Sequence, residues 1–517
     1  MSILQLPAGR PGGSSSPASV GKWLLLTLTP SFIDDKFHHG SDRRGRRAKL
    51  HATSYLDGLR GLAACSVFAY HYTDYNHKFY LPFYGHNDDS NEHDGPSGFM
   101  QLPYVRLLYA GTPMVHVFFV ISGFALSLRP LQYLYNEDYS SSRGPSPAAV
   151  AKSQALIASS AFRRPIRLFL PPLAVTAIAA AEVYILGWMP SFMRAQPNLG
   201  MQIADWASDA VNNLMWPWSW DDGSPRSRYN PHLWTIPMEF THSMFLFLVL
   251  LVLSRLRGPL TRQLTLVCLM IYCLLITRWA AFEFLGGAFL AELHLSSHFK
   301  ASSAHLPNNT TDNTKTEGQQ TPPSSFSKTI LRLVVLVSAG FLLCWPARKD
   351  DMTPLLTWIE NSAPGNYKEG KDFWLAIAAF STVWCAGRIS VFRRILESSV
   401  PQYAGRISFC LYMFQHMILN LMQHHVLGSE YKPATDERQE ELAWGVRGTF
   451  GISSPTQRFA TWWTGLIIMG LMLVCLADLM TRVLDSPVVR LSKRLEGLAF
   501  APGADEVAGG GNGGLEK

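Results

Sequence analysis

Long apolar stretches alternate with short polar segments between residues 51 and 495. A helix that crosses a bilayer needs about 20 mostly apolar residues, and ten stretches approach that length. They lie near 55–74, 107–128, 166–189, 232–254, 262–280, 281–298, 329–346, 372–390, 405–427 and 458–481. No Asp, Glu, Lys or Arg occurs between Arg106 and Arg129, or between Arg406 and Glu430. The pattern predicts an all-α, multi-pass integral membrane protein with about ten transmembrane helices.

Lys and Arg are concentrated on alternate connections between these stretches, as expected for segments that stay in the cytoplasm. The basic set comprises the cluster before residue 50, Arg129, Arg143, Lys152, Arg163, Arg164, Arg255, Arg257, Arg262, Arg388, Arg393, Arg394, Arg490, Lys493 and Arg494. The intervening connections are mixed or acidic, as with Asp88 and Glu440. This alternation predicts an even number of spans with both termini cytoplasmic.

Composition supports a membrane protein rather than a nucleic-acid-binding one. Only 16% of the 517 residues are charged, whereas soluble domains average about 25%. The net charge of +7 comes from residues that flank apolar stretches, so topology explains it and no nucleic-acid partner is expected. The seven cysteines lie inside apolar stretches without paired spacing, which argues against a disulfide framework or a structural zinc site.

We divide the chain into a disordered, basic N-terminal extension (1–50), one membrane domain (51–495) and a disordered, Gly-rich tail (496–517). Residues 300–328 are rich in Ser, Thr, Asn and Pro, which predicts a flexible loop insertion. This loop contains glycosylation patterns at Asn308 and Asn309, although the charge pattern places it in the cytoplasm. We expect the charge pattern to prevail.

Ionisable residues inside apolar stretches are costly to insert and are candidates for function. Arg60 and His71 are eleven residues apart, so they share one helix face about 16 Å apart along the axis. Glu239 lies in the fourth stretch at a depth comparable to that of His71. An ionised Glu beside a His is a common way to build a base for a hydroxyl group. The alternatives are an interfacial His71 and an Arg60 that extends toward the cytoplasm.

The third stretch begins with Arg164, Pro165 and Arg167. Pro165 suits the first turn of a helix, so Arg164 is predicted to cap that helix, with Arg167 on the same side. Two guanidinium groups at the positive end of a helix dipole make a plausible phosphate site. An ordinary basic flank of a transmembrane helix is the simpler interpretation.

Several motifs, in order, resemble the membrane acyltransferase-3 family between about residues 54 and 490. They are Ser54–Ala64 with His71, Val117–Phe124, Arg163–Arg167, His232–Thr235 with Glu239, Phe284–Ala288, Gly405–Tyr412 with His416, and Asp485-Ser486-Pro487. Each motif is weak alone, but their order on ten spans is specific. His116 is a departure, because family members often carry a small or acidic residue at this position.

The resemblance implies an enzyme that moves an acyl group, often acetyl, from acyl-CoA to a hydroxyl of a sugar, lipid or small molecule. By this resemblance Arg164, Arg167 and Arg60 engage the phosphates of the acyl-CoA donor. His71 is then the base, with Glu239 beside it. Trp234 and His416 are weaker candidates for the substrate or oxyanion site, and no metal is expected.

Two alternatives to the enzyme remain on sequence grounds. Intramembrane Arg, His and Glu residues also suit a proton-coupled transporter, although no broken-helix repeat is evident. A non-catalytic membrane receptor or scaffold that retained the fold is the second alternative, although the catalytic groups are present.

Overall fold

The computed structural model describes residues 50–85, 98–135, 144–189, 193–220, 225–304, 324–428 and 445–500. The regular secondary structure of this part of the chain is helical apart from a minimal antiparallel hairpin of β1 (Trp188–Met189) and β2 (Met193–Arg194). The all-α fold class is thus confirmed. The predicted N-terminal extension, most of the glycine-rich tail, and Asn308 and Asn309 lie outside the described residues.

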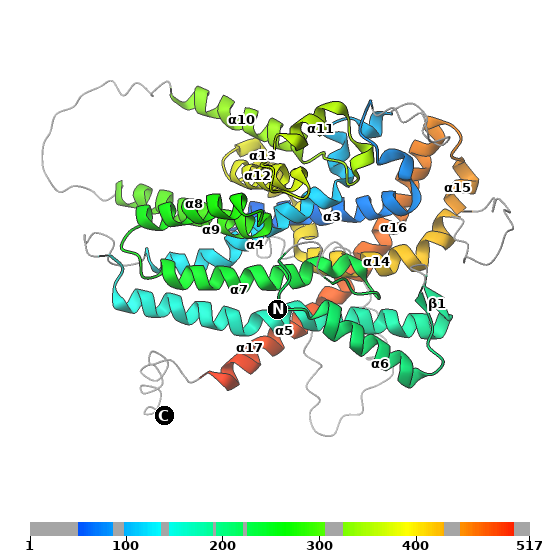
Figure 1. Cartoon of the computed structure of the whole chain (residues 1–517), viewed down its shortest axis with the longest axis horizontal. Helices are drawn as coiled ribbons and strands as arrows, with labels where there is room; N and C mark the ends of the chain where they lie inside the picture. The colour runs from blue at the N-terminus through cyan, green and yellow to red at the C-terminus, as the bar shows by residue number, and fades with distance from the viewer. Residues whose placement is uncertain are drawn as a thin grey trace, which may run out of the picture.

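Each of the ten apolar stretches coincides with a long helix. These helices are α3 (Ser54–Asn76), α4 (Gly111–Tyr133), α5 (Pro147–Leu186), α7 (Thr235–Leu253), α8 (Pro259–Leu275), α9 (Trp279–Ala304), α10 (Ser324–Leu342), α12 (Gly370–Ala386), α14 (Ser399–Leu427) and α16 (Pro455–Met480). Figure 1 shows most of them running side by side along the long axis of the molecule.

Short helical segments connect the long helices. They are η1 (Lys78–Tyr80), η2 (Phe99–Gln101), η3 (Val105–Tyr109), α6 (Leu199–Asp209), η4 (Ala210–Leu214), η5 (Pro231–Trp234), η6 (Lys349–Asp351), α11 (Pro354–Asn361), α13 (Ser390–Leu396), α15 (Gly445–Phe450), η7 (Thr481–Asp485) and α17 (Ser486–Ala499). Helices α9 and α10 extend into the predicted 300–328 loop, and α17 continues beyond the predicted boundary at residue 495.

Only some of the helices meet a strict length and hydropathy requirement for membrane spans. In the described ranges, four do so, namely Gly111–Tyr133, Pro147–Leu186, Pro231–Leu253 and Pro455–Ala499. A fifth is added if α12 and α13, which are bent by 92°, form one span. The count of ten spans and the orientation of the termini therefore stay predictions.

Helix α5 differs from the expected third span. It begins at Pro147, where the Oγ of Ser146 accepts a hydrogen bond from the N–H of Ala149 at 3.2 Å. Pro165 is therefore inside the helix, and the expectation that Arg164 caps a helix beginning at this proline was wrong. Ser146 and Pro147 already provide a start signal, and a helix packed against its neighbours tolerates an internal proline. The dipole of a helix N-terminus does not act on Arg164.

Glycines allow the helices around the centre of the bundle to approach closely. A Cβ atom on Gly405 of α14 would lie 2.1 Å from the carbonyl oxygen of Asp57 on α3. A Cβ atom on Gly287 of α9 would lie 2.2 Å from the carbonyl oxygen of Val120 on α4. Small residues at such crossings let backbones touch. The α3–α14 contact brings Arg60 and Arg406 to the same cavity.

Candidate active site

A cavity of about 210 Å³ lies between α3, α4, α5, α7, α14 and η7. Its charged lining consists of Arg60, Arg164, Arg167, Arg406, Glu239 and Asp485. Four arginines and two carboxylates give this lining a formal charge of +2. The three arginines predicted from the sequence to bind the donor thus line one cavity, although they come from two helices.

Arg164 is held firmly within this cavity. Its Nη2 lies 2.6 Å from Oε1 of Glu239, and its Nε donates to Oγ of Ser243 at 3.0 Å. The hydroxyl of Ser122 donates to the same Glu239 oxygen at 3.1 Å. Arg60 donates from Nη2 to the carbonyl oxygen of Gly405 at 3.1 Å. The backbone and neighbouring side chains therefore fix two of the four guanidinium groups.

Arg167 and Arg406 are exposed on the lining of the cavity. Guanidinium groups form paired hydrogen bonds with phosphate oxygens, and a cavity with several of them suits an anion with more than one phosphate. Sequence reasoning did not identify Arg406 as a site residue, although Arg406 bounds an uncharged stretch and belongs to the Gly405–Tyr412 motif. Its position one residue after Gly405 in a family motif was the available signal.

His71 lies in a cluster of three histidine rings beyond this cavity. Its ring stacks on the ring of His232, with centroids 3.6 Å apart and an interplanar angle of 16°. The ring of His416 meets His232 edge to face at 4.7 Å. Tyr412 joins the two parts of the site, because it lines the cavity and its hydroxyl donates to the carbonyl oxygen of His232.

Glu239 contacts Arg164 instead of His71, so the pairing expected from the sequence is not the one in the structure. The expectation assumed that both residues lie at the same depth near the outer surface. Because α5 starts 17 residues before Arg164, this arginine lies midway along the helix and within reach of Glu239. Any catalytic role of Glu239 stays a prediction.

The two weaker site candidates lie close to this cluster. His416 is 1% exposed, and its Nε2 lies 2.8 Å from Nδ2 of Asn420. Its Nδ1 is buried and makes no hydrogen bond within the described part of the protein. Trp234 ends η5, and the guanidinium of Arg226 lies over its ring at 5.3 Å. Of the two residues, His416 is therefore the better candidate for a side chain that can form a new hydrogen bond, through its Nδ1.

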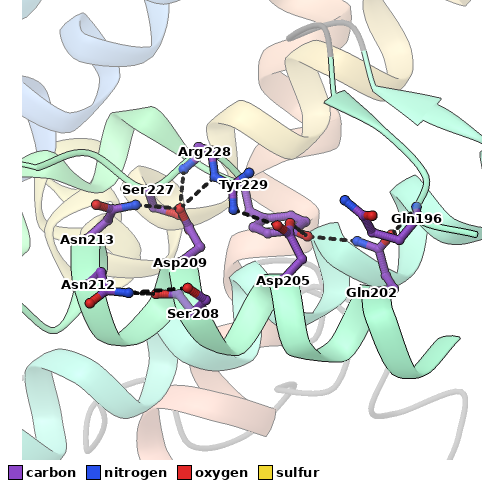
Figure 2. A network of polar contacts seen from close by, with 10 residues as sticks. All are labelled: Gln196, Gln202, Asp205, Ser208, Asp209, Asn212, Asn213, Ser227, Arg228 and Tyr229. Carbon is purple, nitrogen blue, oxygen red and sulfur yellow. Dashed lines mark hydrogen bonds and ion pairs between the residues drawn. The ribbon is translucent and has the colours of Figure 1, made fainter. Parts of the chain in front are cut away.

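A polar network fixes the segment that leads to His232. Figure 2 shows the carboxylate of Asp209, at the end of α6, between Asn213, Ser227 and Arg228. Asp209 accepts hydrogen bonds from Oγ of Ser227 at 2.6 Å and from the N–H of Arg228 at 3.0 Å. Two residues after Arg228, Nδ2 of Asn230 donates to the carbonyl oxygen of Met413 at 3.1 Å. Both α6 and α14 therefore anchor the chain just before His232.

Asp205 strengthens the same network. Burial opposes its ionised form, but hydrogen bonds from Arg228 and Tyr229 outweigh burial and hold the pKa of this carboxyl below its ordinary value. The hydroxyl of Tyr229 donates to Oδ2 of Asp205 at 2.7 Å, and Nη2 of Arg228 lies 2.8 Å from Oδ1. Asp205 is therefore ionised at neutral pH and holds Arg228 and Tyr229 against α6.

Within the described ranges, no three His, Cys, Asp or Glu side chains are arranged to hold a metal ion. The rings of His71 and His232 lie face to face, so their nitrogens do not converge on one point. The cluster instead has the form of an aromatic stack.

Known proteins resemble this chain over most of its length. A family model described as "Acyltransferase domain" matches residues 53–482. The chain is 28% identical over 501 residues to "O-acetyltransferase PaAT-1" of Phomopsis amygdali, with 91% of this chain and 88% of the relative covered. It is 25% identical over 449 residues to "Acyltransferase R4" of Phoma sp. (strain ATCC 20986 / MF5453), covering 77% and 86% of the two chains.

A third relative, "Acyltransferase clz18" of Cochliobolus lunatus, is 24% identical over 443 residues and is aligned over 77% of this chain and 90% of its own length. No solved structure matches the chain. These relatives favour an enzyme over the transporter that intramembrane Arg, His and Glu residues also suggested. Because the family model covers most of the chain, this protein belongs to the membrane acyltransferase-3 family and transfers acyl groups.

Proposed function

We propose that this protein is a ten-span integral-membrane O-acyltransferase with both termini in the cytoplasm. It moves an acyl group, in the first instance acetyl, from acyl-CoA to a hydroxyl of a sugar, lipid or small-molecule metabolite. The observation that carries the proposal is the cavity lined by Arg60, Arg164, Arg167 and Arg406, which Tyr412 connects to the His71 cluster. The name of the Phomopsis amygdali relative supports acetyl as the group.

In this mechanism the arginines hold the phosphates of acyl-CoA while the thioester reaches the histidine cluster. His71 takes the proton of the acceptor hydroxyl as its oxygen attacks the thioester carbonyl carbon. The new C–O bond forms, the C–S bond breaks, and the CoA thiolate leaves with the proton that His71 held. The base is thereby restored, and the ester and CoA thiol are the products.

The negative oxygen of the intermediate needs a hydrogen-bond donor. His416 is suited to this role, because its buried Nδ1 makes no hydrogen bond within the described ranges and its ring lies beside the His71–His232 stack. Trp234 is the second candidate, through its indole N–H.

The donor site is tested by replacing Arg164 and Arg167 together with alanine. Losing two charge-assisted phosphate contacts weakens binding in both the ground state and the transition state, so we expect KM for acetyl-CoA to rise about tenfold or more. Initial rates on purified protein in nanodiscs measure this change. Arg163→Ala is the matched control, because Arg163 pairs with Glu496 of α17 at 3.1 Å and does not line the cavity. Unchanged donor dependence in the double variant would remove the arginines from the donor site.

The base is tested by His71→Ala. General-base catalysis typically contributes about 10²- to 10⁴-fold, so turnover should fall on that scale while KM for acetyl-CoA changes little. His425→Gln is the control, because His425 is an exposed histidine of α14. Normal turnover of a well-folded His71→Ala protein would exclude His71 as the base.

A further inference from the structure

The stack of His71 on His232 is the closest ring contact in the proposed site. The two rings are 3.6 Å apart and nearly parallel, so His232 covers one face of the His71 imidazole. Because Glu239 is engaged with Arg164, no carboxylate contacts His71 among the described residues. The proton that His71 accepts must therefore be stabilised by another group.

His232 is well placed to provide that stabilisation because its own position is fixed from several sides. Its carbonyl oxygen accepts a hydrogen bond from Tyr412, and His416 packs against its ring edge to face. The hydroxyl of Tyr75 lies 3.5 Å from its Nε2. Its Nδ1 is buried without a hydrogen-bond partner in the described structure. Because the two rings are stacked, His232 contacts His71 through its face and not through a nitrogen.

We propose that His232 is a positioning residue for His71. Its ring fixes the orientation of the His71 imidazole and stabilises, through its aromatic face, the imidazolium that forms when the acceptor hydroxyl loses its proton. This inference rests on the proposed role of His71 as the base.

Two physical effects underlie the proposal. A flat ring against one face of His71 leaves its edge open and restricts its rotation, which keeps the reactive nitrogen in place for the acceptor. An aromatic face also attracts a cation, and this attraction grows where water is excluded. Among the described residues, the ionisable groups that contact His232 are His71 and Tyr75 on α3 and His416 and Tyr412 on α14. None of these groups carries a negative charge at neutral pH in its ordinary ionisation state.

The experiment compares His232→Phe with His232→Gln in purified protein. Phenylalanine keeps an aromatic face but has no nitrogen, whereas glutamine keeps a polar group but has no ring. We expect kcat of His232→Gln to fall about tenfold or more, with KM for acetyl-CoA within about twofold of wild type. We expect His232→Phe to keep kcat within about threefold of wild type, because the phenyl ring keeps an aromatic face against His71.

A double variant separates positioning from a purely structural role. If His232 acts through His71, adding His232→Gln to His71→Ala should cost little further turnover. Monodisperse protein with a normal KM for acetyl-CoA establishes that each variant is folded. If His232→Gln does not accumulate in the membrane, His232→Leu provides the same test of a side chain without a ring.

Three results would overturn the inference: full activity of the variant without a ring, equal losses in the Phe and Gln variants, or additive losses with His71→Ala. The proposed function fails separately, because it requires His71→Ala itself to lose turnover. A protein with an essential His71 and a dispensable His232 would keep the function and lose only this inference.

Discussion

The ion pair between Arg164 and Glu239 controls how much positive charge the cavity offers to a donor. The two side chains are 14% and 23% exposed, so their charges are only partly screened by water. Glu239 holds one edge of the Arg164 guanidinium in place. At the same time, its negative charge repels an entering phosphate. The negative charge of Glu239 therefore opposes donor binding, whereas its hydrogen bond to Arg164 favours donor binding.

Glu239→Gln separates these effects, because glutamine keeps an oxygen that accepts hydrogen bonds from Arg164 and Ser122 but carries no charge. We expect KM for acetyl-CoA to fall about threefold, with kcat within about threefold of wild type. Steady-state kinetics measure both constants, and Glu397→Gln is the control because Glu397 pairs with Arg393 away from the cavity. A large loss of kcat with unchanged KM would instead favour the pairing of Glu239 with His71 that the sequence suggested.

The sequence identified four of the six charged residues that line the cavity, but it did not identify Arg406 and did not show which side chains pair. Arg60 and Glu239 were identified because charges within apolar stretches are costly to insert. Arg164 and Arg167 were identified as a pair of guanidinium groups at the start of the third stretch. Their contacts depend on helix depth and rotation, which a single apolar pattern does not define. In the structure Glu239 therefore forms an ion pair with Arg164, and His71 stacks on His232, which the sequence analysis named only as part of a motif.

Among the elements, α6 acts as a brace for the segment that carries His232. Asp209 at its end is 2% exposed and accepts hydrogen bonds from Asn213, Ser227 and Arg228 (Figure 2). Removing this carboxylate takes the partner from one buried donor, on Ser227, and from two partly buried donors, on Asn213 and Arg228. The loss of these contacts should loosen the segment up to His232, because Asn230 lies between them.

Asp209→Ala should lower stability by about 1–3 kcal/mol, the usual cost of unsatisfied buried polar groups. Hydrogen–deuterium exchange should rise in α6 and in residues 227–229, and kcat should fall less than in His232→Gln. Asn212→Ala is the matched control, because the exposed Asn212 of η4 bonds only to Ser208 of the adjoining α6 in the described contacts (Figure 2). Equal exchange in the two variants would show that Asp209 does not brace this segment.

Helix α5 shows where element prediction from the sequence succeeds and fails. Its apolar half was predicted, but its first 19 residues precede the predicted span because they contain Lys, Gln, Ser and Arg. Pro165 looked like a start signal, whereas packing against α7 and α17 keeps the helix continuous through it. In Figure 1, α17 lies beside α5, and Arg163 pairs with Glu496 at this contact. Tertiary contacts of this kind are absent from a single-sequence pattern.

At the scale of the whole molecule, the site lies where two hydrophobic cores meet. One core gathers residues mainly from α4, α7, α9 and α12, the other gathers residues mainly from α14 and α16, and α3 contributes to both. Phe118 and Tyr412 pack against both cores and also line the cavity. The arginines of the cavity belong to helices whose basic flanks are predicted to be cytoplasmic. The orientation of the bundle therefore decides which compartment supplies the acyl donor.

Glycosylation in a eukaryotic host tests that orientation. With both termini cytoplasmic, the segment that contains Asn308 and Asn309 is also cytoplasmic, so neither asparagine should be glycosylated despite its sequence pattern. The matched positive control is His93→Thr, which completes an acceptor pattern at Asn91 in the acidic connection predicted to face the opposite side. We expect endoglycosidase treatment to shift the electrophoretic mobility of the His93→Thr protein and to leave wild type unchanged. A shift in wild type that Asn308→Gln and Asn309→Gln abolish would invert the orientation. The arginine-lined cavity would then face away from cytoplasmic acyl-CoA, so this outcome would also contradict the proposed donor site.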